Sequence, residues 1–449
     1  MSYAGEAEIR LFMKTNLEPN GSSEVSRRQF LRSSTTVALA APILASRALG
    51  AQASVTPAAT LRVGLIGCGG RGTGAAAQAL QADPNTTLVA MGDAFKDRLQ
   101  NSLEELKKQK DVASRVIVSE ETCFIGFDAY KQVIASGVDV VLLATPPHFR
   151  PIHLKAAVEA GKHVFAEKPV AVDAPGVRSV LSTCEEARKK NLTIISGLAM
   201  RYSFGHRETI KRIHESAIGE IRALQANDFR GPIWVKPRRP EWTEMEYQMR
   251  NWYYFTYLSG DFNVEQHVHM LDTCAWIMRD EYPVSAMGIG GRQVRTGPDY
   301  GNIFDHHSVI YEYANGVKLH AYCRQQSGGV NDVSAEITGV KGTAHFNSRG
   351  QFITGADKWT YRGEKNNNFV TEHEELFASI RNRKAVSNGE YMARSTLMAI
   401  LGRMATYTGQ KISWEQALNS KEDLTPEGYS WDAKPPKSEI AVPGLTPFR

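Results

Sequence analysis

The sequence predicts an α/β fold that begins with a doubly wound parallel sheet. Strand-like and helix-like segments alternate from Leu61 to about Ser196, and the inner strands are fully apolar. A glycine-rich turn joins the first strand to the first helix. This alternation is typical of βαβ units, whose strands are buried on both faces. The 449 residues are too many for one small core and indicate two domains.

The first strand and its turn read L-R-V-G-L-I-G-C-G-G-R-G over residues 61–72. Its glycines have the G-x-G-x-x-G spacing between a strand and a helix, which allows a tight turn and close approach of a pyrophosphate to the backbone. The start of the helix adds unpaired N–H donors and a partial positive charge. We predict a dinucleotide site in this turn, formed by Gly67, Gly69, Gly70, Arg71 and Gly72.

A carboxylate follows the second predicted strand, Thr87–Met91. Asp93 lies about 20 residues beyond the last glycine, as expected of the acid that binds an adenosine ribose. A carboxylate here accepts a hydrogen bond from a free 2′-hydroxyl and repels a 2′-phosphate, so the sequence favours NAD over NADP. Arg71 and Lys96 are the basic side chains that would soften this discrimination.

Further elements follow in order. Leu99, Leu103 and Leu106 recur at helical spacing, residues 115–118 resemble a short strand, and a helix begins at Pro151. The strands 138–144 and 163–166 both end in polar residues, and ligands of open parallel sheets bind outside the carboxyl ends of the strands. We therefore expect these strand ends to contribute Thr145, Pro146, His148, Glu167 and Lys168 to the cofactor site.

These motifs, with A-G-K-H-V-F-A-E-K-P at residues 160–169 and A-I-G-E-I at 217–221, resemble the Gfo/Idh/MocA family of oxidoreductases. The family comprises glucose–fructose oxidoreductase, inositol dehydrogenase and their relatives, and the resemblance covers roughly Leu61 to Trp414. It implies an N-terminal Rossmann domain and a C-terminal α+β domain with a large, mostly antiparallel open sheet. It also implies a homo-oligomer, a dimer or tetramer formed through that sheet.

The second half agrees with this implication. Ala314-Asn315-Gly316 is a hairpin turn between alternating runs, and two helices are expected at 372–381 and 391–407. The predicted strands are 221–230, 285–294, 308–313, 317–324, 333–338 and 343–346.

The densest polar cluster of the second half is the segment 260–272. If it forms one helix, Glu265 and His269 lie one turn apart on the same face. The resemblance implies a carboxylate followed four residues later by a histidine beside the substrate carbon, although Asp is commoner than Glu at the first position. Hydride transfer from a carbinol needs a base for the hydroxyl proton, and histidine suits that task with an unperturbed pKa of roughly 6.5. We predict Lys168, His269 and Glu265 as catalytic residues.

Two other interpretations of this cluster stay open. His267 and His269, with the neighbouring carboxylates, could ligate a metal, but their spacing is no strong zinc signature, so we predict no metal. The same residues could also be ordinary polar groups of a helix. Asp305-His306-His307 either lines the pocket or forms a turn.

Aromatic side chains beside polar donors suit a carbohydrate, which stacks its C–H faces on rings. On this ground we predict substrate contacts from Arg201, Tyr202, Arg250, Trp252 and His267. The alternative is an aromatic core with a surface arginine.

Charge and cysteine content exclude several classes of protein. The formal charge is +5, but six basic and four acidic residues lie in the first 53, which leaves +3 for the rest. So small a surplus predicts no nucleic-acid partner. The five cysteines are scattered and form no C-x-x-C pair, so no disulfide framework is expected.

The N-terminus resembles an export signal. Ser26-Arg27-Arg28-Gln29-Phe30-Leu31 is a twin-arginine pattern, followed by a short apolar stretch and the small residues Ala51-Gln52-Ala53 before a plausible cleavage point. No cysteine lies near that point, so we expect no membrane anchor after cleavage. The alternative is a tail with a chance Arg-Arg pair. The signal predicts a periplasmic or secreted protein exported in the folded state.

These patterns divide the chain into five segments. They are a signal peptide (1–53), a linker (54–60), an NAD(P)-binding Rossmann domain (61–196), a substrate and oligomerisation domain (197–423) and an extended tail (424–449). The combined prediction is an exported NAD(H)-dependent oxidoreductase that acts on a sugar or glycoside with a tightly held cofactor. The alternatives are an NAD-dependent glycosidase that uses transient oxidation and elimination, and a non-catalytic sugar-binding protein.

Overall fold

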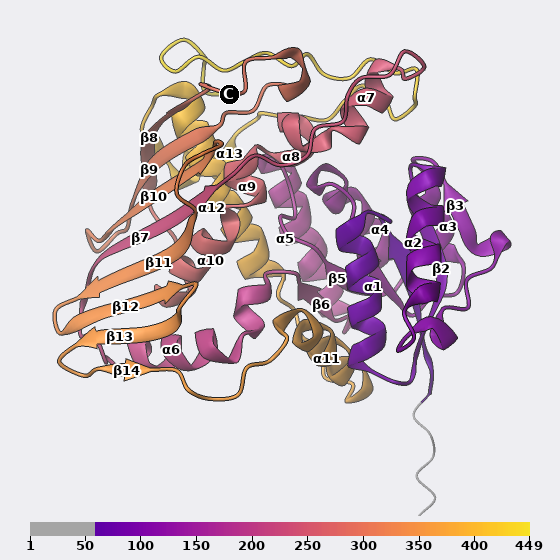
Figure 1. Ribbon diagram of the computed structural model, residues 1–449, viewed down its shortest axis with the longest axis horizontal. Helices are drawn as coiled ribbons and strands as arrows, with labels where there is room; N and C mark the ends of the chain where they lie inside the picture. The colour runs from indigo at the N-terminus through magenta and orange to yellow at the C-terminus, as the bar shows by residue number, and fades with distance from the viewer. Residues whose placement is uncertain (1–58) are drawn as a thin grey trace, which may run out of the picture. The chain divides into compact units, whose positions relative to one another are not determined.

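The computed structural model describes residues 59–449, so the predicted export signal lies outside the described residues. The first sheet contains six parallel strands in the order β3-β2-β1-β4-β5-β6 (Figure 1). This is the predicted Rossmann arrangement, in which β1 and β4 lie side by side at the point where the strand order reverses. The strands are β1 (Leu61–Ile66), β2 (Thr86–Asp93), β3 (Cys123–Ile125), β4 (Val140–Leu143), β5 (His163–Ala166) and β6 (Ile194–Ser196).

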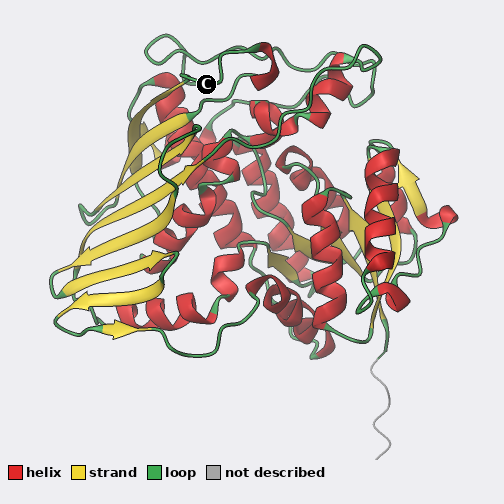
Figure 2. Cartoon of the chain, in the orientation of Figure 1, coloured by secondary structure: helices red, strands yellow, loops and turns green. Residues whose placement is uncertain are grey.

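Helices cover both faces of this sheet, because alternate residues of each strand point to opposite sides (Figure 2). One face packs against α3, α4 and α5, and the other against α1, α2 and, from much later in the chain, α11. These helices are α1 (Gly70–Ala82), α2 (Lys96–Lys108), α3 (Ala129–Ala135), α4 (Arg150–Glu159), α5 (Ala174–Lys189) and α11 (Asn368–Arg381).

The prediction of a strand at residues 115–118 is wrong. Ala113–Arg115 is a 3₁₀ turn, and Val116 makes only an isolated bridge to Leu88. The 3₁₀ turn occupies the start of the expected strand and turns the Arg115 guanidinium back to the carbonyl of Asp83 at 3.0 Å, so only Val116 remains to bridge β2. The strand that pairs with β2 is β3 instead.

The second sheet has nine strands in the order β14-β13-β12-β11-β7-β10-β9-β8-β15. Only the pairing of β10 with β7 is parallel, which confirms the mostly antiparallel sheet. The strands are β7 (Ile221–Arg230), β8 (Ser285–Gly291), β9 (His306–Glu312), β10 (Lys318–Gln325), β11 (Asp332–Gly339), β12 (Gly342–Asn347), β13 (Gly350–Gly355), β14 (Trp359–Thr360) and β15 (Ile412–Ser413). β8 ends at Gly291, earlier than the expected 294.

One face of the second sheet is covered by α6, α10 and α12, and the other is partly exposed, with Ile289 74% accessible. The long helix α12 also packs against α5 of the first domain, so a single apolar core extends across both sheets. The remaining helices are α6 (Phe204–His214), α7 (Glu244–Arg250), α8 (Thr256–Ser259), α9 (Phe262–Glu265), α10 (Val268–Ile277), α12 (Gly389–Thr408) and α13 (Trp414–Asn419).

Residues 424–449 contain neither helix nor strand and run over the top of the view in Figure 1, past α7 and α8. All five cysteines are free. Within the range 59–449 we find no helix with the length and apolar character needed to cross a membrane.

Candidate active site

The glycine-rich turn between β1 and α1 has the shape that a pyrophosphate requires. Gly67 has a φ of +99°, and a Cβ there would lie 2.5 Å from the Thr145 nitrogen. A Cβ on Gly72 would lie 1.8 Å from the Gly67 carbonyl oxygen, so only glycine allows the helix to approach the strand this closely. Above Gly69 and Gly70, by contrast, the space is open for at least 4 Å. The turn therefore fits the dinucleotide of the predicted site.

Asp93 lies at the end of β2, directly beside this turn. Its carboxylate accepts hydrogen bonds from the backbone N–H groups of Cys68 at 2.6 Å and Phe95 at 2.8 Å. Burial raises the pKa of Asp93, and these two hydrogen bonds partly oppose the shift. Each carboxylate oxygen keeps a free lone pair, which suits a ribose hydroxyl.

The Arg71 side chain bonds two carboxylates and one amide. It bonds Glu167 at the end of β5, Glu372 of α11 at 3.0 Å and Gln78 at 2.6 Å. Burial, followed by the nearby Glu167, raises the pKa of Glu372 well above its usual value. Arg71 therefore joins the turn to the end of β5 and to α11, and its guanidinium is engaged by these three partners.

The ends of β4 and β5 are held together by Arg150, which is fully buried. Its guanidinium donates to the carbonyls of Glu167 at 2.8 Å and Leu143 at 3.1 Å. Thr145 accepts a further, longer bond from the same guanidinium at 3.4 Å. Pro146 precedes a 3₁₀ turn, Pro147–Phe149, that contains the buried His148. The residues predicted at these strand ends are thus brought together along one edge of the sheet.

Lys168 connects this edge to the second domain. Its Nζ lies 2.8 Å from a carboxylate oxygen of Glu265 and 2.5 Å from the carbonyl oxygen of the same residue. Both side chains are little exposed, at 13% and 12%. The ion pair therefore joins the end of β5 to the end of α9 across the domain boundary.

The segment 260–272 does not form one continuous helix, the condition under which Glu265 and His269 would share a face. It contains two helices, α9 and α10, separated at Gln266 and His267, and both of these N–H groups donate to the carbonyl of Phe262. The side chains of Asn263 and His267 are buried and bond each other at 3.2 Å. The side-chain bond joins residues four positions apart, and the break itself is the change at His267 from an i→i−4 to an i→i−5 backbone bond.

His269 lies in the first turn of α10, and its Nδ1 is buried without a partner. Burial lowers the pKa of His269 well below 6.5, and the positive charges of Lys168, Arg230 and Arg71 lower it further. The imidazole is therefore neutral at physiological pH. Lys168 bonds Glu265 directly and is near enough for its charge to lower the pKa of His269, so the three predicted catalytic residues lie in one neighbourhood.

The end of β7 adds groups that the sequence analysis missed. The Asp228 carboxylate is buried and pairs with the Arg230 guanidinium at 2.5 Å. Burial raises the pKa of Asp228, while the positive charges of Arg230 and Lys168 oppose the shift. Tyr253 accepts a hydrogen bond from Gln325 at 2.7 Å, and burial and then the charge of Glu265 raise its pKa. The only sequence signal was the polar ending of a long strand, Asp228-Phe229-Arg230.

Arg201, Tyr202 and His267 are buried in the protein interior. Arg201 pairs with Asp272 at 2.8 Å and Asp280 at 2.6 Å. The Tyr202 hydroxyl donates to Asn388 at 2.7 Å. His267 is fully buried, and burial lowers its pKa to about 3. These contacts assign the three residues to the core, so we withdraw the expected substrate contacts.

Arg250 and Trp252 also have protein partners. Arg250 pairs with Asp97 at the start of α2 at 3.1 Å and lies 4.1 Å above the Phe95 ring. Trp252 is half-buried against Trp234 at 6.3 Å. Arg250 therefore contacts the adenosine side of the predicted cofactor site, not the neighbourhood of Lys168.

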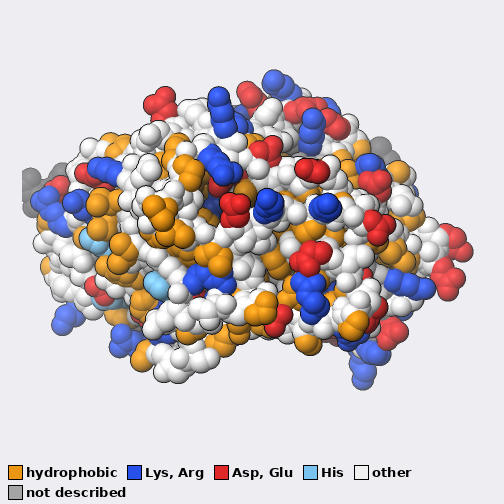
Figure 3. Space-filling model, turned by 90° about the horizontal axis from the view of Figure 1, so that it is seen from above, with side chains coloured by type: hydrophobic (Ala, Val, Ile, Leu, Met, Phe, Trp, Pro, Cys, Tyr) orange, Lys and Arg blue, Asp and Glu red, His pale blue; other side chains and the backbone are white. Residues whose placement is uncertain are grey.

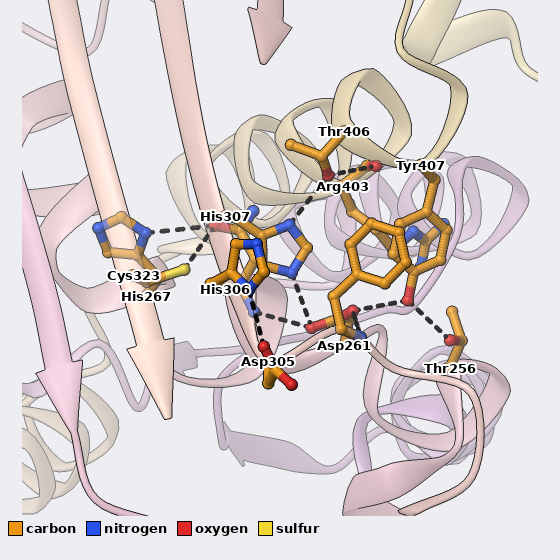
Figure 4. Close-up of polar contacts among 12 residues, drawn as sticks. Thr256, Asp261, His267, Asp305, His306, His307, Cys323, Arg403, Thr406 and Tyr407 are labelled. Atoms are coloured by element: carbon orange, nitrogen blue, oxygen red, sulfur yellow. Dashed lines mark hydrogen bonds and ion pairs between the residues drawn. The ribbon is translucent and has the colours of Figure 1, made fainter. Parts of the chain in front are cut away.

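A buried network holds the start of α9 (Figure 4). Asp261 has a φ of +78°, a conformation that favours glycine, yet its carboxylate accepts bonds from Tyr407 at 2.6 Å and His307 at 3.2 Å. His307 also bonds Thr406 at 2.9 Å, so it belongs to this network and not to the pocket. The network fixes the turn that carries Glu265. In the described part of the chain, no three His, Cys, Asp or Glu residues are grouped as metal ligands.

The comparisons with known proteins agree with this geometry. Residues 61–196 match the model of an oxidoreductase family with an NAD-binding Rossmann fold, and residues 206–345 match the GFO/IDH/MocA C-terminal domain. Inositol 2-dehydrogenase 3 of Saccharopolyspora erythraea is 28% identical over 291 residues, which is 64% of this chain and 73% of that protein. The 2,7-anhydro-N-acetylneuraminate hydratase of Escherichia coli is 31% identical over 179 residues, 40% of this chain and 44% of the hydratase.

Solved structures show the same fold at low sequence identity. An aldose-aldose oxidoreductase from Caulobacter crescentus, complexed with glycerol, superposes with a TM-score of 0.62 at 17% identity, over 79% of this chain and 99% of that one. A levoglucosan dehydrogenase, complexed with NADH and levoglucosan, gives a TM-score of 0.60 at 17% identity with the same coverage. Because the two matched domain models together span more than half of the 449 residues, the chain belongs to the Gfo/Idh/MocA family of NAD-binding oxidoreductases.

Proposed function

We propose that this protein transfers hydride between a hydroxyl-bearing carbon of a sugar or glycoside and a tightly held nicotinamide. The observation that carries the proposal is the Lys168–Glu265 ion pair, which lies between the carboxyl edge of the Rossmann sheet and the neutral imidazole of His269. A base, a cation and an orienting carboxylate are the groups that carbinol oxidation needs.

The roles follow from the charge states. Bound NAD supplies the hydride acceptor. Neutral His269 takes the hydroxyl proton, since burial and the surrounding cations keep the imidazole unprotonated before substrate arrives. The Lys168 ammonium stabilises the oxyanion that develops on the substrate, and Glu265 holds that ammonium in place through its bond at 2.8 Å. Asp228, Arg230 and Tyr253 offer hydrogen bonds to the other hydroxyls.

The sugar assignment has support from relatives. One relative is an inositol 2-dehydrogenase, and one structural neighbour is a complex with levoglucosan. Inositol and levoglucosan both carry hydroxyl groups on a ring. A second candidate function is favoured by the hydratase, which is named for an anhydro sugar. In that candidate, the same residues oxidise a carbon transiently, and elimination then cleaves the glycosidic bond.

Export and assembly form the rest of the proposal. The twin-arginine pattern at residues 26–31 supports transport of the folded protein to the periplasm or beyond. Free NAD is scarce there, so a cofactor that dissociated after each turnover would be lost. The partly exposed face of the second sheet is the proposed surface for a dimer or tetramer.

The deciding experiment combines two measurements on the purified protein. Mass spectrometry of the denatured protein tests for a released nucleotide, and a panel of sugars and glycosides is then assayed for both nicotinamide reduction and cleaved products. We expect released NAD and turnover of at least one sugar that His269→Ala and Lys168→Ala abolish. Unchanged turnover in both variants would refute the catalytic assignment, and sugar binding without any product would favour the non-catalytic alternative.

A further inference from the structure

The chain beyond α13 crosses the molecule between two fixed points. At the first, the N–H of Leu424 donates to the Asp173 carboxylate at 2.9 Å. At the second, the Asn302 side chain donates to the carbonyl of Glu439 at 3.2 Å. We call the intervening residues 425–438 the strap. Figure 3 looks down on this side of the molecule, where acidic and basic side chains are interspersed.

The strap has little backbone structure of its own. It contains no helix or strand, and its one hydrogen bond between backbone groups joins Ala433 to Ser430 at 3.1 Å. The strap is therefore attached to the rest of the protein by a small set of side-chain contacts. A segment held in this way can lift without breaking a ladder of backbone hydrogen bonds.

Two aromatic side chains supply those contacts. Trp431 packs between Phe95 and Phe127, with ring centroids 5.0 Å and 4.6 Å away. The Tyr429 hydroxyl bonds the Nε2 of His148 at 2.8 Å. Both aromatic side chains of the strap therefore contact the Rossmann domain rather than the second domain.

The residues that the strap contacts flank the predicted cofactor site. Phe95 donates its backbone N–H to Asp93, the acid expected at the adenosine ribose, and His148 follows β4. Arg250 of α7 closes the same side, because it lies 4.1 Å above the Phe95 ring. The strap and α7 thus meet over the adenosine end of the site.

We propose that the strap is a clasp that retains NAD, with Trp431 and Tyr429 as the contacts that keep it closed. The clasp must lift before the dinucleotide leaves, so these side chains set the rate of cofactor loss. The inference rests on NAD binding and deepens the proposed retention of the cofactor. Neither matched family model reaches the strap, since they end at residues 196 and 345.

The test measures NAD dissociation from the full-length protein, by dilution into excess unlabelled NAD after loading with labelled NAD. Trp431→Ala removes the aromatic packing and should release NAD about tenfold faster or more. Tyr429→Phe removes only one hydroxyl and should accelerate release by a smaller factor, about fivefold. Trp359→Ala is the matched control, because Trp359 lies on the edge strand β14 and should leave the rate unchanged.

A second readout follows the strap itself. Lys437 is an exposed trypsin site within the strap, so we expect NAD to slow cleavage after Lys437 in the wild type and to slow it less in Trp431→Ala. Equal release rates and equal protection in the wild type and both strap variants would overturn the clasp while leaving the proposed hydride transfer intact. A wild type that binds no NAD would refute both. Fast release from Trp431→Ala with normal turnover in excess NAD would support the clasp independently of the chemistry.

Discussion

The Nζ of Lys168 makes two bonds to Glu265, one to the carboxylate at 2.8 Å and one to the backbone carbonyl at 2.5 Å. Together the two bonds fix the position of the Lys168 Nζ relative to the start of α10. A single lysine thereby aligns the end of β5 with the helix that carries His269. The same side chain therefore takes part both in the contact between the two domains, which α5 and α12 also join, and in the proposed chemistry.

Lys168→Met should lower the rate of hydride transfer by roughly 10²–10³, because the developing oxyanion loses its cation. The loss of rate should persist when NAD is saturating, since the glycine turn and Asp93 are untouched. The measurement is single-turnover nicotinamide reduction together with calorimetric NAD binding. Lys155→Met, at a surface lysine whose side chain is 60% exposed, is the matched control and should behave as the wild type. A wild-type rate in Lys168→Met would contradict the assigned role.

Two glycines of the same turn should respond differently to alanine. Gly69 has a φ of −73° and open space around it, so Gly69→Ala should fold normally but hinder the pyrophosphate and weaken NAD binding about tenfold or more. Gly72→Ala places a Cβ 1.8 Å from the Gly67 oxygen, so α1 must shift, at a cost of about 1–3 kcal/mol in the free energy of unfolding. Chemical denaturation without cofactor and NAD titration separate the two effects. Equal stability of the two variants would contradict this account.

The parts of the site that the sequence predicted are those encoded locally. The glycine turn, Asp93 and the ends of β4 and β5 each follow a strand directly, so the parallel sheet gathers them at one edge without further information. Glu265 and His269 were identified through a family pattern, although they lie on two successive helices, α9 and α10, and not on one.

The parts that were missed depend on contacts between distant segments. Asp228 and Arg230 join the site because β7 lies at the centre of the second sheet, which no local pattern reveals. In the same way, Trp431 meets Phe95 across more than 300 positions of the sequence. Arg201 shows the opposite error, since an arginine after a strand resembles a ligand-binding group until its partner Asp272 is known.

Arg201→Ala tests that reassignment. Removal of the guanidinium leaves Asp272 buried and unpaired, which should cost about 3–5 kcal/mol in the free energy of unfolding. Arg222→Ala removes an exposed partner of Glu220 and should cost about 0–1 kcal/mol. Denaturant titration of both variants gives the comparison. A stable Arg201→Ala protein with a raised KM for the sugar would restore the substrate role.

Buried histidines should make the fold sensitive to acid. Burial lowers the pKa of His148 and His206 to about 4 and that of His153 and His267 to about 3. Below about pH 6.5 the unfolded chain binds protons on these four side chains that the folded chain does not bind. The free energy of unfolding should therefore fall as the pH is lowered from about 6.5 to 4, by about 1.4 kcal/mol per pH unit for each histidine.

His153→Phe isolates one of these contributions. The ring of His153 stacks on Tyr130 at 4.3 Å and Phe149 at 5.8 Å, so a phenyl ring preserves much of the packing while removing the titrating group. The slope of unfolding free energy against pH, measured by urea titration between about pH 6 and 4, should decrease by about 1.4 kcal/mol per pH unit. An identical slope in the wild type and His153→Phe would mean that His153 takes up its proton in the folded state. In that case its burial would not oppose charging, and the acid sensitivity would have to arise from other groups.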